Sequence, residues 1–265
     1  MADEPASYRI NRDEDQVRRE QDRLHVLARV ADGRTRRALT RIGIAAGWQC
    51  CDVGSGAGSV AAWMAEQVAP SGRVVSIDVD TRFQPPSAGL IEVRTLDVTK
   101  EPIGRDEFDV VHARGVLQHI AQREHVLDAM IGAAKPGGWI VVGDIDWVQF
   151  DAQSVPEPFA TLSRTMRDMS TAQHGYDGEW GRRLVDAFER RGLVDVDARG
   201  EVWTMRGGTD SAAWYVDALE RALAVIPTDV FPSGFDTAAA IAQAREPSFA
   251  ILSPISVTAV GRKPA

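Results

Sequence analysis

Residues 50–59 have the sequence Cys-Cys-Asp-Val-Gly-Ser-Gly-Ala-Gly-Ser. The apolar start predicts a buried strand, and glycines at alternate positions predict a tight turn that opens a helix. Glycines let backbone amides approach a ligand, and the N-terminus of the following helix favours negative charge. The stretch therefore predicts a ligand-binding turn. The alternative is a turn that only packs a helix on a strand.

The spacing of the glycines and the acid before them narrow the class of ligand that the turn could bind. The pattern is GxGxG, with Ser59 where the dinucleotide-binding fingerprint GxGxxG has its last glycine. Asp52 is a poor neighbour for a pyrophosphate and a good one for an ammonium or a sulfonium. We therefore expect a zwitterionic amino-acid group, with its amino group near the acid and its carboxylate near the amides.

Outward from this turn, short apolar runs alternate with helical segments, which is typical of βαβ units and a mostly parallel sheet. We expect the strands of this region at residues 49–53, 73–77, 91–96, 108–113 and 139–142. Before it, helices are expected at residues 12–30 and 35–46, with Gly33 as a stop between them. After it, helices are expected at residues 156–169, 179–191, 211–225 and 237–245, and strands at 194–205 and 249–260. The segment 170–175 is expected to be a flexible loop, and 249–260 a final edge strand.

Polar or small residues end each predicted strand, at the edge of the sheet where open α/β folds bind ligands. Asp78 lies 24 residues after Gly54, near the separation of about 20 at which such folds place an acid on ribose hydroxyls. Its alternative role is a helix cap, and Asp80 could substitute for it. Asp97 is spaced to accept a proton from an exocyclic adenine amine, with a simple turn aspartate as the alternative.

Composition limits the classes of protein. The 265 residues are 44% hydrophobic and 26% charged, which is typical of a soluble globular protein with one large α/β domain or two small ones. A net charge of −8 disfavours a nucleic-acid partner, because binding to polyphosphate needs clustered Lys and Arg. The adjacent Cys50 and Cys51 are expected to be small core residues on opposite faces of a strand in a reducing cytoplasm. No run approaches the length of a membrane span, and no metal-binding motif or P-loop is found.

The strand-end residues resemble the class I S-adenosylmethionine-dependent methyltransferases over about residues 48–147. Asp52-Val-Gly-Ser-Gly-Ala-Gly resembles their first motif, Ile77-Asp78 their second and Asp97 their third. Residues 108–114, Phe-Asp-Val-Val-His-Ala-Arg, and 135–138, Lys-Pro-Gly-Gly, resemble the fourth motif and the fifth-strand turn. Residues 111–120 are similar to ubiquinone and menaquinone C-methyltransferases and to small-molecule methyltransferases of bacterial secondary metabolism.

The resemblance implies an α/β fold with a Rossmann-like, seven-stranded, mostly parallel sheet whose last strand is antiparallel. It implies a single methyltransferase domain, residues 1–265, with an N-terminal helical lid at 1–46 and a cofactor-binding core at 47–150. Cap insertions are expected at 151–177 and 208–247, and closing core elements at 178–207 and 248–265.

It also implies a set of residues that bind S-adenosyl-L-methionine. This set comprises Tyr8, Gln21, Asp52, Gly54, Ser55, Gly56, Asp78, Val79, Asp97, Val98, Ala113 and Arg114. Tyr8, Glu14 and Gln21 hold the places of a tyrosine, an acid and a glutamine that close over the cofactor in relatives. Tyr8 could instead be a terminal anchor, Gln21 a solvated helix residue and Arg114 one half of a structural salt bridge.

Methyl transfer is an in-line displacement, so positioning supplies much of the catalysis and a base matters only when the nucleophile carries a proton. His119 and Asp144 are the catalytic candidates, although His119 could cap a helix and Asp144 a loop. Asp146, Trp147, His174 and Tyr176 are expected to bind substrate, with cap packing as the alternative for the aromatic residues. His112, inside a strand, is interpreted as a core histidine.

We therefore expect a cytoplasmic enzyme that methylates O, N or C of a small hydrophobic or aromatic metabolite. Its partner would be a small molecule, with no nucleic acid and no membrane insertion; a homodimer stays open. The alternatives are a cyclisation or other non-methylating step on the same fold, a non-catalytic binding protein, and a NAD-dependent oxidoreductase, which the GxGxG spacing disfavours. The fourth strand lacks an Asn-Pro-Pro-Tyr-like signature, which counts against methylation of DNA amines.

Overall fold

A seven-stranded sheet in the order β3-β2-β1-β4-β5-β9-β6 forms the centre of one of the chain's two compact units. The structure is a computed structural model and describes residues 14–224 and 226–265. The sheet unit comprises Ala31–Asp146, Glu179–Gly200 and Ser256–Ala265. The helical unit comprises the described residues up to Val30, Trp147–Gly178 and Glu201–Ile255. The assignment of residues 1–265 to a single domain, with its internal boundaries, stays a prediction.

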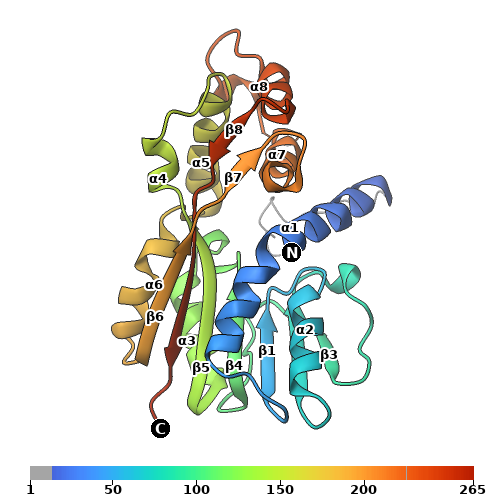
Figure 1. Cartoon of the computed structure of the whole chain (residues 1–265), viewed down its shortest axis with the longest axis vertical. Helices are drawn as coiled ribbons and strands as arrows, with labels where there is room; N and C mark the ends of the chain where they lie inside the picture. The colour runs from blue at the N-terminus through green and yellow to red at the C-terminus, as the bar shows by residue number, and fades with distance from the viewer. Residues whose placement is uncertain (1–13, 225) are drawn as a thin grey trace. The chain divides into compact units, whose positions relative to one another are not determined.

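The strands of the large sheet confirm the expected fold class (Figure 1). They are β1 (Gln49–Val53), β2 (Arg73–Asp78), β3 (Ile91–Thr95), β4 (Phe108–Arg114), β5 (Ala134–Asp146), β6 (Val194–Glu201) and β9 (Ile255–Arg262). The pairs β1–β2, β1–β4, β2–β3 and β4–β5 are parallel. The last strand, β9, lies between β5 and β6 and runs against β6.

Helices cover both faces of this sheet because successive strand residues point to opposite sides. On one face, Cys50 packs with residues of α2 (Ser59–Val68) and with Leu39 near the end of α1 (Glu14–Arg41). On the other face, Cys51 packs with residues of α3 (Arg123–Ala133) and α6 (Trp180–Glu189). The placement of the two cysteines on opposite faces is confirmed. Short 3-10 turns follow β2 and β4, namely η2 (Thr81–Phe83) and η3 (Leu117–His119).

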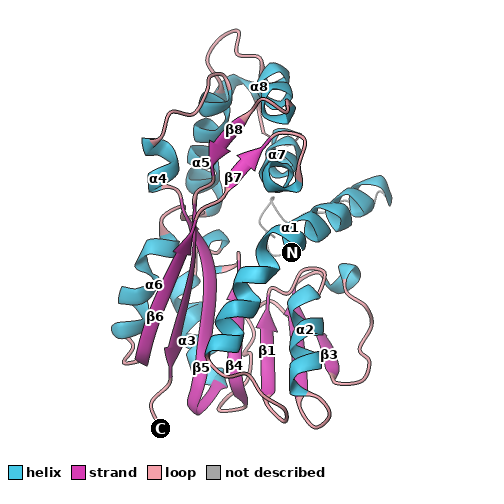
Figure 2. Cartoon of the chain, viewed as in Figure 1, coloured by secondary structure: helices cyan, strands magenta, loops and turns pink. Residues whose placement is uncertain are grey.

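The helical unit holds a second, two-stranded antiparallel sheet (Figure 2). It pairs β7 (Thr204–Arg206) with β8 (Ala250–Leu252). The other elements of this unit are α4 (Val148–Ala152), α5 (Phe159–His174), α7 (Asp210–Leu223), η4 (Thr228–Val230) and α8 (Thr237–Arg245). No helix of the described residues combines the length and the apolar character needed to cross a membrane.

Four expectations for local structure were wrong. Residues 194–205 are not one strand, because β6 ends at Glu201 and Thr204–Arg206 form β7 in the second sheet. Gly33 does not end a helix, because α1 is continuous from Glu14 to Arg41. Residues 170–174 are the last turn of α5, which ends at Gly175 in the left-handed conformation, rather than a loop. Residues 249–260 are not one edge strand, because Ser253 and Pro254 separate β8 from β9, and β9 lies inside the large sheet. Proline lacks the N–H that a continuous strand would use here.

Candidate cofactor site

The turn after β1 requires glycine. Gly54, Gly56 and Gly58 all have positive φ, at 66°, 57° and 76°, a backbone conformation that side chains strain. A Cβ on Gly54 would also lie 2.3 Å from Cγ2 of Val116. The turn can therefore adopt this shape, with α2 starting directly after it at Ser59, because its three glycines lack side chains.

Asp78, at the end of β2, is joined to this turn. Its Oδ2 accepts a hydrogen bond from the Gly56 amide at 2.8 Å, and its Oδ1 accepts one from the Asp80 amide at 3.0 Å. Burial raises the pKa of Asp78, and the two backbone hydrogen bonds oppose that rise. The acid expected to hold a ribose thus lies beside the glycine turn, while the adjacent Val79 is about half exposed.

A hydroxyl network links the turn to the segment after β2. The Ser55 amide donates to the Ile77 carbonyl at 3.0 Å, and Ser76 Oγ lies 2.8 Å from Ser55 Oγ. Gln84 completes the network: its Oε1 accepts from Ser76 and its Nε2 donates to Ser55 Oγ. Sequence reasoning missed Gln84, because it lies in a loop outside every motif and only the fold brings it to the turn.

Behind the turn, a buried polar row crosses three strands. Ser76 on β2 is the register partner of Asp52 on β1, and Asp52 is the register partner of His112 on β4. All three side chains are buried. Asp52 Oδ1 lies 2.7 Å from His112 Nδ1, whereas Asp52 Oδ2 and His112 Nε2 have no hydrogen-bond partner among the described residues. The acid expected near an ammonium group therefore keeps one oxygen available.

Arg114, at the end of β4, binds a carboxylate of the protein. Its Nη1 donates to Asp32 Oδ1 at 2.8 Å and lies 3.4 Å from Thr35 Oγ1. Asp32 also accepts from the hydroxyl of Ser59, the first residue of α2, at 3.2 Å, and pairs with Arg36. Arg114 therefore forms the structural salt bridge that was its alternative to binding the cofactor. Asp32 was missed by sequence reasoning, although the spacing of Asp32 and Arg36 is typical of a helical ion pair.

Two further residues expected to bind the cofactor lie at the end of β3. Asp97 accepts from the amide and the hydroxyl of Thr99, at 3.0 and 2.6 Å, and pairs with Lys100. Burial acts to raise the pKa of Asp97, but the hydrogen bonds from Lys100 and Thr99 lower it below its usual value. Val98 is buried. In these contacts Asp97 has the geometry of a turn aspartate.

Of the three other cofactor candidates, two lie among the described residues, and no hydrogen bond given above joins them to the turn. The side chain of Ala113 is fully buried in the core on the α3 and α6 face. Gln21 is exposed on α1, and Tyr8 lies outside the described residues. Within the part of the chain that the structure describes, no group of three or more His, Cys, Asp or Glu side chains is arranged to hold a metal ion.

The catalytic candidates lie around the turn that follows β4. Asp144, on β5, is buried, and its carboxylate oxygens make no hydrogen bond of normal geometry with any residue that the structure describes. Burial raises the pKa of Asp144 well above its usual value, although backbone amides from Gly115 to Gln118 oppose the rise. His119 is half-buried, with Nε2 3.1 Å from Gln118 Nε2, and Gln118 accepts from the Ile145 amide at 2.7 Å.

The substrate candidates fall in both units. In the sheet unit, Asp146 is buried and accepts from Arg182 Nε at 3.0 Å. In the helical unit, the indole N–H of Trp147 donates to the Tyr176 hydroxyl at 2.6 Å, and the Arg167 guanidinium lies 4.5 Å from the centre of the Trp147 ring. His174 is the last residue of α5 and is half-buried.

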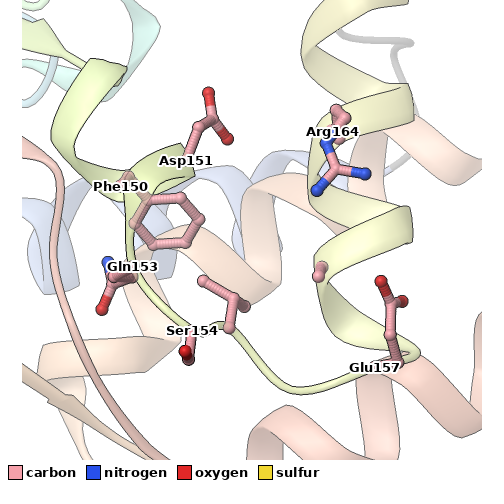
Figure 3. A pocket seen from close by; sticks show the side chains of 8 residues that line it. Phe150, Asp151, Gln153, Ser154, Glu157 and Arg164 are labelled. Carbon is pink, nitrogen blue, oxygen red and sulfur yellow. The ribbon is translucent and has the colours of Figure 1, made fainter.

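A pocket of about 250 Å³ opens in the helical unit (Figure 3). None of the predicted site residues lines it. Its lining consists of Phe150, Asp151, Gln153, Ser154, Val155, Glu157, Ala160 and Arg164. Arg164 extends from α5 on the side opposite Phe150, and because Asp151 and Glu157 also line the hollow, its lining is mainly polar.

Comparisons with known proteins agree with this geometry. Residues 51–142 match the family model described as a methyltransferase domain. The chain is 31% identical over 167 residues to methyltransferase str2 of Strobilurus tenacellus, covering 61% of this chain and 59% of that one. It is 29% identical over 109 residues to a ubiquinone/menaquinone biosynthesis C-methyltransferase of Pseudomonas fluorescens, covering 38% of this chain and 43% of that one. The chain spans about half the length of the curated relatives it matches.

Among solved structures, a candidate methyltransferase from Bacillus halodurans C-125 is similar, with a TM-score of 0.53 and 18% identity. The match covers 86% of this chain and 98% of that chain, and at this identity it shows the shared fold.

The residues around the turn fit S-adenosylmethionine, the cofactor of this family. Asp52 offers a buried oxygen without a partner, and the glycine turn leaves its backbone open to close approach. These comparisons support a class I S-adenosylmethionine-dependent methyltransferase, with the match to the methyltransferase domain at residues 51–142.

Proposed function

We propose that this chain binds S-adenosylmethionine and transfers its methyl group to O, N or C of a small acceptor with hydrophobic or aromatic character. The proposal rests on the two acids beside the glycine turn. The Gly56 amide donates a hydrogen bond to Asp78, and Asp52 is buried on the strand that precedes the turn. Such a site complements a ligand that carries a cationic amino-acid group at one end and a diol at the other.

When bound, the cofactor supplies an electrophilic methyl group on a sulfonium. Asp52 Oδ2 would accept from the ammonium group, and the Asp78 carboxylate from the ribose hydroxyls. Because the sulfur leaves without a proton, the protein's main task is to hold donor and acceptor in line and to exclude water. Gly54 contributes because, without a side chain, it lets the backbone approach the cofactor closely.

For an acceptor that carries a proton, we propose His119 as the base. Its ring lies beside Gln118, and Gln118 is anchored on the Ile145 amide, so the ring's place depends on the η3 turn. Asp144 is buried near the same turn. We therefore propose that Asp144 acts by positioning the turn rather than by touching the acceptor.

For the acceptor itself, the helical unit supports an apolar molecule that also has a polar group. The pocket of Figure 3 is lined mainly by polar residues, Arg164 among them, whereas the aromatic side chains of Trp147 and Tyr176 belong to the same unit, as does His174. The proposal includes a small-molecule substrate, no nucleic acid and a cytoplasmic location.

Calorimetric titration with S-adenosylhomocysteine tests the cofactor site. We expect binding by the wild type and a Kd at least about tenfold higher for Asp78→Ala, because charge-assisted hydrogen bonds to the ribose would be lost. The matched control is Asp80→Ala, which leaves Asp78 and the Asp80 amide in place and is expected to bind as the wild type does. No binding at high micromolar concentration, or undiminished binding by Asp78→Ala, would contradict the proposal.

Product analysis separates methyl transfer from the other chemistry that this fold can host. Methylation adds one methyl group to the acceptor and releases S-adenosylhomocysteine in equal amount, whereas a cyclisation leaves the cofactor unchanged. Mass spectrometry of acceptor and cofactor after turnover shows which occurs. Turnover without loss of S-adenosylmethionine would refute the methyl-transfer part alone.

A further inference from the structure

Asp52 and His112 form a buried pair that the sequence motifs do not explain. They lie opposite each other on β1 and β4, each at most 2% exposed, and are joined by the 2.7 Å contact between Oδ1 and Nδ1. The second polar atom of each side chain is buried without a partner among residues 14–224 and 226–265. Two unsatisfied polar atoms in one buried pair are costly and call for an explanation.

Counting hydrogen bonds selects one protonation pattern for the pair. If the imidazole carried two protons, or if Asp52 were the donor, the N–H at Nε2 would be a buried donor without an acceptor. Orphaned buried N–H groups are rarer than under-satisfied acceptors. The pattern that avoids such a donor has the proton on Nδ1 of a neutral His112, donated to an ionised Asp52.

This pattern leaves a carboxylate oxygen that needs a donor. The pair then carries one net negative charge, and both unpartnered atoms, Asp52 Oδ2 and His112 Nε2, are acceptors. Asp78 adds a second acid in this region, since the charge of Asp52 contributes to raising the pKa of Asp78. Among the described residues the ion-pair partner of Asp52 is His112 rather than a Lys or Arg, so the charge is available to a cationic ligand.

We infer that His112 is a positioning residue for cofactor binding: its Nδ1–H holds Oδ1 of Asp52, so that Oδ2 stays ionised and aimed for the ammonium group of the cofactor's amino-acid part. The inference rests on the proposed function and assigns a role to a histidine that the motifs leave as core. A purely structural His112 would stabilise the sheet and treat all ligands of the site alike.

Two ligands that differ in the amino-acid part test this role. S-Adenosylhomocysteine carries the ammonium group, and 5′-methylthioadenosine lacks the amino-acid part altogether. We expect His112→Val to raise the Kd for S-adenosylhomocysteine about tenfold or more, because the Asp52 carboxylate loses its charge-assisted hydrogen bond, and to leave the Kd for 5′-methylthioadenosine within about twofold. Binding of the second ligand also reports that the variant is folded.

The conservative variant supplies the rescue. His112→Asn places an amide N–H close to the position of Nδ1, and we expect it to restore most of the affinity for S-adenosylhomocysteine. Asp52→Asn keeps the shape and removes the charge, and it should show the same ligand-selective loss as His112→Val. If His112→Val does not fold, the comparison of Asp52→Asn with His112→Asn carries the test.

Calorimetry with both ligands gives distinct outcomes. Equal weakening of both ligands, or a loss in His112→Asn as large as in His112→Val, overturns the positioning role and leaves the proposed function intact. Failure of the wild type to bind either ligand overturns the proposed function, and this inference with it.

Discussion

Asp144 shows how the surroundings of one residue change its chemistry. Its carboxyl group is buried on β5 without a counter-charge in hydrogen-bond contact, and burial raises its pKa well above the usual value. Asp146, two residues on, is equally buried but accepts from Arg182. Identical side chains at the end of one strand therefore have opposite electrostatic roles, and the difference comes from the partner that the fold supplies.

The stability of the protein should depend on this difference. In the unfolded chain Asp144 ionises near pH 3.9, about its reference value, whereas the folded protein keeps the proton to higher pH. Between these values the unfolded state has lost a proton that the folded state retains, so stability falls as pH rises through this window. The amide of Asp144→Asn does not ionise in this pH range, so this variant lacks that loss of stability. We expect its Tm to exceed that of the wild type by about 2 °C or more at pH 8, and the advantage to shrink toward pH 4.

Thermal unfolding followed by circular dichroism at the two pH values measures this effect. Asp146→Asn is the control, and it should lower the Tm at pH 8 because it removes the carboxylate paired with Arg182. A Tm of Asp144→Asn below that of the wild type at pH 8 would show that the carboxyl group is stabilising as an anion.

At Gly54 both the backbone conformation and the packing against Val116 favour glycine. Gly54→Ala places a Cβ against Val116 and adopts a positive φ, so we expect a loss of about 2–4 kcal/mol in the free energy of unfolding. Adding Val116→Ala should relieve the contact but not the backbone strain, so the double variant should be more stable than the sum of the single effects predicts. Denaturant unfolding of the four proteins gives the coupling, and strict additivity would mean that the turn has moved.

At the scale of elements, helix α1 shows how packing overrides a local stop signal. Gly33 is disfavoured in a helix by about 1 kcal/mol, but Ala38 and Leu39 in the following turns are buried against the sheet. Asp32 is also held by Arg114 of β4. These contacts stabilise a continuous helix by more than one glycine weakens it.

Replacing this glycine should therefore help the protein. Gly33 has no positive φ, and a Cβ there would meet only the Arg37 side chain at 3.5 Å, an ordinary contact. We expect Gly33→Ala to raise the free energy of unfolding by about 0.5–1 kcal/mol. Gly43→Ala is the matched control: it has open space but a φ of 83°, so it should destabilise. Chemical denaturation measures the free energy of unfolding of both variants. Changes of the same sign in the two variants would refute the explanation.

At the scale of the whole molecule, the net charge argues against nucleic-acid binding. The chain has a net charge of −8, and its densest group of arginines lies on the second half of α1. Arg36 pairs with Asp32, Arg41 pairs with Asp197, and Arg34 and Arg37 also have interactions within the structure. The arginines are therefore engaged with the protein's own groups.

We expect no RNA binding by this chain even at low salt. Filter binding with a structured RNA at about 50 mM salt is the measurement, with a basic RNA-binding protein as the positive control. Retention that falls steeply with added salt would show that the α1 arginines form a working phosphate-binding surface and would reopen a nucleic-acid acceptor.

Much of the candidate cofactor site could be proposed from the sequence because its signals are local. The apolar strand, the glycine turn and Asp78 follow from residue types within short windows, and the structure brings Gly56 and Asp78 together. Gln84 and Asp32 could not be found this way. Each reaches the site from a segment with no motif, through contacts that exist only once the sheet has formed.

The alternation of strands and helices over residues 49–142 and the motifs that carry the family resemblance follow from the pattern of residues along the chain, since apolar periodicity and turn chemistry are local properties. The pairing of Asp52 with His112, the continuity of α1 and the separation of β8 from β9 do not. They depend on strand register, on burial and on partners distant in sequence, and those are set when the chain packs.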